Sequence, residues 1–97
     1  MKSSNDWKTL EDCRDAIDSI DSEMLALLNK RMNIVQRVGE IKKDTGGAIY
    51  RPEREKAIVE RLTKLSEEKQ GLLNASAIEA IFLEVFAVSR NLELPER

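Results

Sequence analysis

The amino-acid sequence predicts an all-α protein with three helices per chain, the first of them very long. Apolar residues recur at helical spacing along most of the chain. No run alternates apolar and polar residues between turn signals, as a half-buried strand would. Only two prolines and four glycines occur in 97 residues, so long helices can form.

The first expected helix runs from about Asp6 to Lys43, and Gly46 and Gly47 follow it as a stop. At 1.5 Å per residue it is roughly 57 Å long, whereas a compact chain of this size has a radius of gyration of about 13 Å. Its apolar stripe therefore needs a partner, most simply a second copy of the chain. The stripe is a strict heptad, with Leu10, Ile17, Met24 and Val38 at position a and Cys13, Ile20, Leu27, Ile34 and Ile41 at position d.

Two shorter helices are expected after the glycines. Pro52 suits the first position of the second helix, which runs toward Gly71. The third helix is expected to begin near Asn74 or Ser76 and to end before Pro95. One face of it carries Ile78, Ile81, Phe82, Val85, Val88 and Leu92.

Composition limits the possible functions. The length suits one domain over residues 1–97, with about 1–8 and 94–97 expected as flexible ends. A net charge of −2 argues against nucleic-acid binding. The absence of histidine rules out serine–histidine or cysteine–histidine catalysis and makes a metal site unexpected, and Cys13 has no partner for an internal disulfide. No window resembles a signal peptide or a membrane span, so the cytoplasm is the expected location.

Several polar residues occupy positions where the helical pattern calls for apolar ones. Arg31 stands at heptad position a, and Arg14 and Lys42 stand at position e beside the stripe. Ser89 and Glu93 lie one turn apart beside the stripe of the third helix. Arg31 could instead set the register of a coiled coil, and Arg14, Lys42 and Glu93 could simply be solvated. Half-buried cations, however, call for an anion.

The start of the second helix is also unusual in its charges. Glu53 and Glu55 suit the helix dipole and need no functional explanation. Arg51 and Arg54 oppose the dipole, and Arg51, at the expected N-cap, offers no acceptor for the first amides. This arrangement also indicates an anion nearby.

Helix geometry suggests how these cations could share a ligand. Arg31 and Lys42 are three turns apart on nearly the same face, roughly 16 Å along the axis, so two long side chains could hold a metabolite between them. Arg14 lies about 42 Å from Lys42 and would have to come from another chain. In an antiparallel pair of long helices it would do so.

The ordered set of these residues resembles the all-helical class of chorismate mutase, and the resemblance covers about Leu10 to Glu93. It is carried by "CRDAIDSIDSEMLALLNKRMNIVQRVGEIK", "YRPERE" and "IFLEVFAVSRNLE". In particular, the chain resembles the mutase domain at the N-terminus of bifunctional mutase–prephenate dehydratases, in which "YRPERE" and a terminal "LE-x-P" also occur. A fused prephenate dehydratase domain in the full-length protein would fit this resemblance.

The resemblance implies an intertwined helical homodimer with two active sites. It also implies a cofactor-free isomerase that converts chorismate to prephenate on the route to phenylalanine and tyrosine. A pericyclic reaction needs a reactive conformer and stabilisation of charge on the ether oxygen, not a nucleophile or a metal. Lys42 and Glu93 would donate to the ether oxygen, and Glu55 would accept from the ring hydroxyl. The groups implied for the two substrate carboxylates are Arg31, Arg54, Ser89 and Arg14 of the partner chain.

Two positions depart from the commonest family pattern. Arg51 stands where much of the family has an acidic residue, so a substrate-binding role for Arg51 would involve its backbone amide rather than its side chain. Glu93 stands where many members have glutamine. An ionised glutamate cannot donate a hydrogen bond, so Glu93 must be protonated to help, and turnover is expected to improve as the pH falls toward 5.

Two other functions remain open at this point. An isochorismate–pyruvate lyase would share the helical dimer and much of the cationic pocket. A non-catalytic helical dimerisation module would explain the heptad equally well, but it would not explain Arg31 in the seam or two arginines at a helix start.

Overall fold

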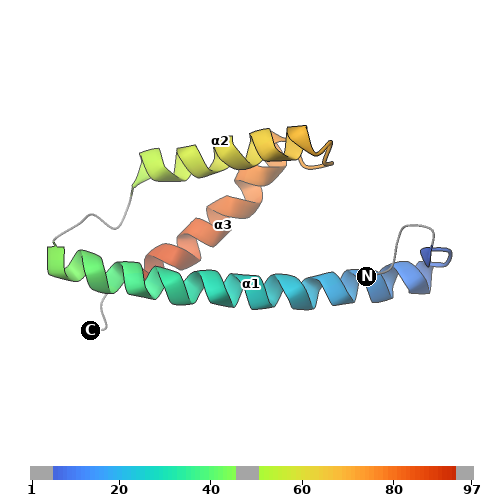
Figure 1. The fold of residues 1–97 in the computed structure, drawn as a ribbon, viewed down its shortest axis with the longest axis horizontal. Coiled ribbons are helices and arrows are strands. Elements are labelled where there is room, and N and C mark those ends of the chain that lie inside the picture. The colour runs from blue at the N-terminus through green and yellow to red at the C-terminus, as the bar shows by residue number, and fades with distance from the viewer. Residues whose placement is uncertain (1–5, 46–50, 94–97) are drawn as a thin grey trace. The chain divides into compact units, whose positions relative to one another are not determined.

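In the computed structural model, residues 6–45 and 51–93 are described, and they contain three helices and no strand (Figure 1). The helices are α1 (Leu10–Thr45), α2 (Pro52–Glu68) and α3 (Ala75–Glu93). The all-α prediction with a very long first helix is therefore confirmed. The expected flexible ends and the stop at Gly46 and Gly47 fall largely or wholly outside the described residues.

Helix α1 begins four residues later than the sequence pattern predicted, and the reason is a capping box. The backbone amide of Asp12 donates to Thr9 Oγ1 at 3.0 Å, and the amide of Thr9 donates to Asp12 Oδ2 at 3.3 Å. This reciprocal pair satisfies amides that a helix start otherwise leaves without partners. Thr9, not a residue near Asp6, is therefore the N-cap, and α1 spans 36 residues, about 54 Å.

Helix α2 begins at Pro52 as predicted, with Arg51 as its N-cap. The Arg51 carbonyl accepts from the amides of Arg54 at 3.0 Å and Glu55 at 3.1 Å, while its side chain makes no capping bond. At the other end, Gln70 adopts a left-handed φ of 55°, and the Gly71 amide donates to the Ser66 carbonyl at 2.8 Å. That six-to-one bond is typical of a Schellman C-terminus.

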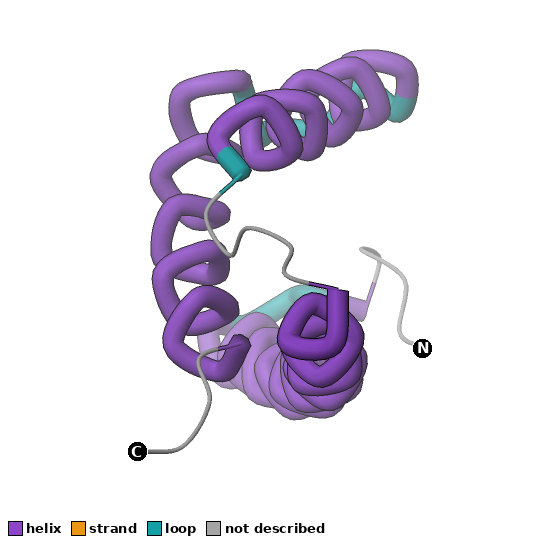
Figure 2. The backbone as a smooth tube through the Cα atoms, turned by 90° about the vertical axis from the view of Figure 1, so that its left-hand side faces the viewer, coloured by secondary structure: helices purple, strands orange, loops and turns teal. Residues whose placement is uncertain are grey.

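Helix α3 begins at Ala75 because Asn74 caps it. The Ala77 amide donates to Asn74 Oδ1 at 2.9 Å, which is the N-cap bond that an asparagine favours. Figure 2 shows the short teal loop that joins α2 to α3. The two helices contact each other directly.

The chain divides into two compact units, residues 1–34 and 35–97. The second unit contains the last turns of α1 together with α2 and α3. Its buried apolar side chains are Ile58 from α2 and Ile78 and Phe86 from α3. Packing of α2 on α3 therefore forms the small core that supports the polar side chains described next.

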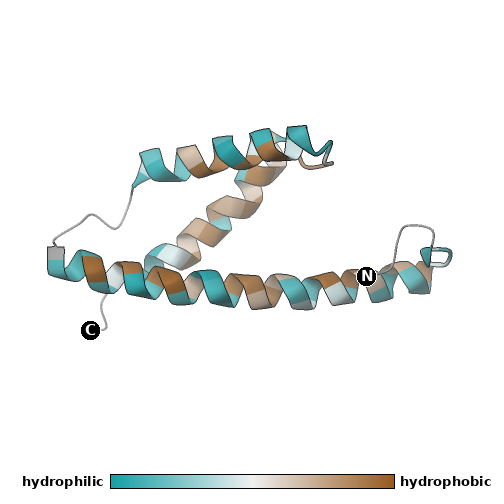
Figure 3. Cartoon of the chain, viewed as in Figure 1, coloured by the Kyte–Doolittle hydropathy of each residue, from teal (hydrophilic) through white to brown (hydrophobic). Residues whose placement is uncertain are grey.

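Apolar side chains recur along α1 (Figure 3), but most of them are exposed in the single chain. The exposed fractions of its nine exposed large apolar residues run from 36% to 66%. A stripe of this length uncovered in water is unusual for a stable monomer. These nine residues, called the α1 stripe below, are Leu10, Ile17, Ile20, Met24, Leu25, Leu27, Leu28, Ile34 and Ile41.

Candidate active site

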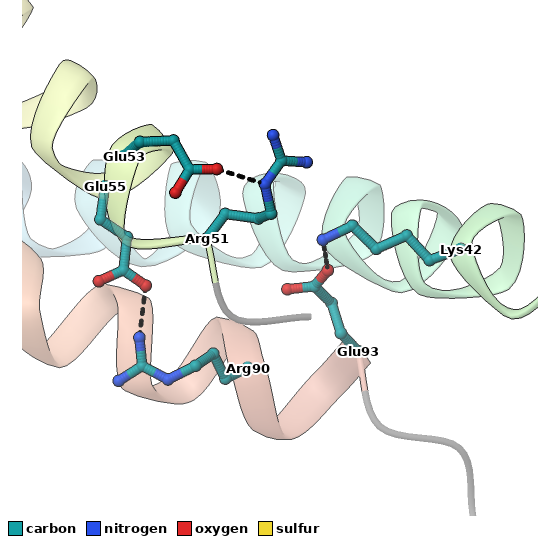
Figure 4. Close-up of polar contacts among 6 residues, drawn as sticks. All are labelled: Lys42, Arg51, Glu53, Glu55, Arg90 and Glu93. Atoms are coloured by element: carbon teal, nitrogen blue, oxygen red, sulfur yellow. Dashed lines mark hydrogen bonds and ion pairs between the residues drawn. The ribbon is translucent and has the colours of Figure 1, made fainter. Parts of the chain in front are cut away.

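A part-buried ion pair joins the last turns of α1 to the end of α3. Lys42 Nζ lies 2.8 Å from Glu93 Oε1, and the two residues are 51 positions apart in the sequence (Figure 4). The Lys42 side chain is 20% exposed and that of Glu93 only 9%. The structure therefore brings together two residues for which the family resemblance implies a shared role.

Gly39 makes this close approach of α1 and α3 possible. It is buried and lies one turn before Lys42. A Cβ atom at Gly39 would lie 2.8 Å from the carbonyl oxygen of Glu93 and 3.0 Å from its Cα, which is too short for a real contact. The backbone of Glu93 thus occupies the space that any side chain at position 39 would need.

A second ion pair joins the start of α2 to α3. Arg90 Nη1 donates to Glu55 Oε2, and the two side chains are 33% and 19% exposed (Figure 4). Arg90 and Glu93 are three residues apart in α3, so they lie on one face of that helix. The two interhelical ion pairs are therefore neighbours, and α3 carries one member of each.

Arg90 was missed by the sequence analysis. It directly follows Ser89 and precedes Glu93 by one turn, and that spacing was the available signal. In a chain that is 35% charged, one more arginine did not stand out.

Ser89 is buried, with 7% of its surface exposed. Its hydroxyl donates to the carbonyl of Val85, one turn back in α3, at 2.7 Å. Serine side chains within helices often bond their own backbone in this way. To donate to a substrate carboxylate, as the sequence predicts, the Ser89 hydroxyl must rotate away from Val85.

The side chain of Arg51 has a local partner. Its Nε donates to Glu53 Oε1 at 2.7 Å, and both side chains are exposed, by 51% and 66%. This hydrogen bond, more than any other contact, holds the pKa of Glu53 below its ordinary value of 4.5. Pairing with Glu53 therefore explains the Arg51 side chain without a ligand. Arg54, in the first turn of α2, is exposed.

The other two predicted arginines belong to the unit formed by residues 1–34. Arg14 is exposed on the second turn of α1, and Arg31 is half-buried further along it. The expected clamp between Arg31 and Lys42, and the contribution of Arg14 from a partner chain, remain predictions.

Residues 6–45 and 51–93 contain neither a metal-binding cluster nor a membrane-spanning helix. No group of three or more acidic or cysteine side chains in these ranges could hold a metal ion. None of the three described helices is both long and apolar enough to cross a membrane.

The described side chains can bind and stabilise an electron-rich group. The Lys42 ammonium has three N–H donors, so its bond to Glu93 leaves donor capacity for a ligand oxygen. Fixed donors in a partly dehydrated site stabilise charge that develops in a transition state more strongly than water does. The geometry suits a reaction driven by positioning and electrostatics.

Comparisons with known proteins agree with this description. A sequence model of the family described as "Chorismate mutase type II" matches residues 13–94. A bifunctional chorismate mutase/prephenate dehydratase of Aquifex aeolicus is 38% identical over 85 residues, which are 87% of this chain and 24% of that protein. The chain thus spans about a quarter of that relative. An isochorismate pyruvate lyase of Pseudomonas aeruginosa is 33% identical over 85 residues, 88% of this chain and 81% of the lyase.

A solved structure shares the fold. The crystal structure of chorismate mutase from Helicobacter pylori in complex with prephenate superposes with a TM-score of 0.74 at 34% identity, covering 87% of this chain and 88% of that one. The family model, the relatives and the solved structure all match most of the chain. The chain belongs to the chorismate mutase type II family.

Proposed function

We propose that this chain converts chorismate to prephenate by a Claisen rearrangement, as a cofactor-free cytoplasmic homodimer in phenylalanine and tyrosine biosynthesis. Family membership supports the reaction, and the Helicobacter relative of the same fold was solved with prephenate bound. Fusion of mutase and dehydratase in the Aquifex relative supports the pathway and a fused dehydratase domain in the full-length protein.

The observation that carries the proposal is the Lys42–Glu93 pair at 2.8 Å. In the rearrangement the breaking C–O bond places negative charge on the ether oxygen. Lys42 donates to that oxygen, and Glu93 adds a second donor when it carries a proton. Neither step needs a nucleophile or a metal.

Substrate binding is assigned to the remaining predicted residues. Two substrate carboxylates require cations, and guanidinium groups match carboxylates in geometry. Glu55 accepts from the ring hydroxyl, and Arg51 acts through its backbone amide. The carboxylates are assigned to Arg31, Arg54, Ser89 and Arg14 of the partner chain.

The homodimer is supported by the exposed α1 stripe. A second copy of α1 would cover the stripe and remove several hundred Å² of apolar surface from water, at about 25 cal/mol per Å². Seven of the nine residues of the α1 stripe stand at heptad positions a and d, which suits a helix partner. The same pairing would bring Arg14 of one chain to the site of the other.

The test follows chorismate loss and prephenate formation with the purified chain, together with its mass in solution. Lys42→Met should lower kcat/KM by about 100-fold or more, as expected when a transition-state donor is removed. Lys64→Met, which removes an exposed lysine of α2, serves as the matched control and should leave turnover unchanged. An inactive wild-type dimer would refute the proposal.

Isochorismate pyruvate lyase activity is the second candidate, because the Pseudomonas lyase matches this chain over most of both lengths. Separate incubations with chorismate and isochorismate distinguish the two. Prephenate from chorismate supports the mutase, and salicylate with pyruvate from isochorismate supports the lyase.

A further inference from the structure

Arg90 is the cation of the second interhelical ion pair, and the proposed mechanism gives it no role. Its guanidinium comes from α3 and bonds the carboxylate of Glu55 on α2, 35 residues away in sequence. Both side chains are partly buried, at 33% and 19% exposure. Arg90 also lies one turn from Glu93, the partner of Lys42, so both ion pairs have one member on α3.

We propose that Arg90 is a positioning residue that holds the Glu55 carboxylate in place to accept the ring hydroxyl of the substrate. The inference rests on the proposed mutase function. It assigns Arg90 a role through Glu55, without contact with the substrate.

The geometry of the pair favours this role. Arg90 uses Nη1 and Glu55 uses Oε2, so one oxygen of the carboxylate takes the guanidinium bond. An ionised carboxylate has about four acceptor positions, which leaves capacity for a hydroxyl donor. A charge-assisted bond restricts the Glu55 rotamer before the substrate arrives, and such preorganisation lowers the cost of binding and reaching the transition state.

Charge balance favours it as well. Glu93 and Glu55 bring two carboxylates close to a site that must accept a dianionic substrate. Each is paired with a cation, Glu93 with Lys42 and Glu55 with Arg90. Without Arg90, the Glu55 carboxylate would face the substrate carboxylates uncompensated. Removing one member of a partly buried pair leaves the other unsatisfied.

The test compares Arg90→Leu, Glu55→Leu and the double variant by kcat and KM for chorismate. Arg90→Leu should lower kcat/KM by about 10- to 100-fold, the range expected for a lost charge-assisted bond. The double variant should be no worse than Glu55→Leu alone. Arg90→Lys, which keeps the cation without the planar fork, should recover part of the loss. The matched control is Arg61→Leu, an exposed arginine of α2, which should leave both constants unchanged.

A chorismate analogue without the ring hydroxyl separates positioning from direct binding. If Arg90 acts through Glu55, the penalty of Arg90→Leu should be smaller with this analogue, because only the repulsion between the unpaired Glu55 carboxylate and the substrate carboxylates remains. A penalty of undiminished size with the analogue, or one that adds fully to that of Glu55→Leu, means that Arg90 contacts the substrate itself and overturns the inference.

Further measurements separate a folding defect, and a failure of the proposed function, from a failure of the inference. Helical circular dichroism and solution mass verify each variant. If Arg90→Leu does not fold, Arg90→Lys replaces it in the comparison. Its loss in kcat/KM should be smaller and should disappear when Glu55→Leu is also present. An active wild-type chain with an Arg90→Leu variant of unchanged kcat/KM overturns only the inference, whereas a wild-type chain inactive on chorismate overturns the proposed function and the inference with it.

Discussion

The backbone of Glu93 lies directly against Gly39, so that a Cβ at position 39 would meet the Glu93 carbonyl oxygen at 2.8 Å. This contact and the Lys42–Glu93 ion pair are one turn apart on α1. The end of α3 is therefore fixed to α1 both by backbone packing and by charge. The space at Gly39 determines where the Glu93 carboxylate can be.

Gly39→Ala should accordingly impair the site without touching any charged group. The added methyl group must push the backbone of Glu93 away, at a cost of about 1–3 kcal/mol. A shift of about 1 Å in a catalytic group can cost about 100-fold in rate, so kcat should fall by about 10- to 100-fold. Thermal unfolding at fixed protein concentration and steady-state kinetics measure the two effects.

Gly71→Ala is the matched control for that variant. A Cβ at Gly71 would meet the Ser66 hydroxyl oxygen at 2.7 Å, and that hydroxyl can rotate away from its bond to the Leu73 carbonyl. The expected cost is one hydrogen bond, about 1 kcal/mol, with unchanged turnover. Equal loss of activity in the two variants would contradict a specific role for Gly39.

The helices could be predicted well from sequence because local signals specify them. Pro52 begins α2, and the region of Asn74 begins α3, as the turn and capping preferences indicate. The start of α1 was predicted too early because the heptad does not reveal that Thr9 and Asp12 form a capping box. Local bonding, not apolar periodicity, decides where a helix begins.

The site could be predicted only in part. Lys42 and Glu93 were expected to act together, and they pair at 2.8 Å. The bond of Arg90 to Glu55 and the contact at Gly39 depend on how α3 packs against other helices, which periodicity does not encode. An arginine is ordinary in a chain that is 35% charged until its partner on another helix is known.

The Lys42–Glu93 pair leads to a prediction about pH. An ionised Glu93 accepts from Lys42 and cannot donate to the ether oxygen. If the protonated form is the active one, kcat/KM should rise as the pH falls toward 5. Glu93→Gln, which donates at every pH, should be more active near neutrality and nearly independent of pH. A flat wild-type profile, or a glutamine variant with a steep one, is inconsistent with this role.

Arg31→Leu separates an enzyme from a plain dimerisation module. Leucine completes position a of the heptad, so the dimer should be equally or more stable. A site that uses Arg31 for a substrate carboxylate should lose about 100-fold or more in kcat/KM. Chemical denaturation at fixed concentration and chorismate turnover are measured on the same sample. Unchanged turnover with raised stability would favour the module.

A mixing experiment can test whether each site draws Arg14 from the other chain. In the proposed dimer, Arg14→Ala and Lys42→Met each inactivate both sites. A heterodimer of the two variants contains one site with both defects and one site with neither. Random exchange at equal amounts makes half of the dimers heterodimers, so about a quarter of wild-type activity should return. Lys42→Met mixed with Arg31→Leu, which would damage residues of the same chain's site, should show no recovery. If the Arg14→Ala mixture also stays inactive although mass spectrometry shows heterodimers, Arg14 and Lys42 serve the same site from one chain.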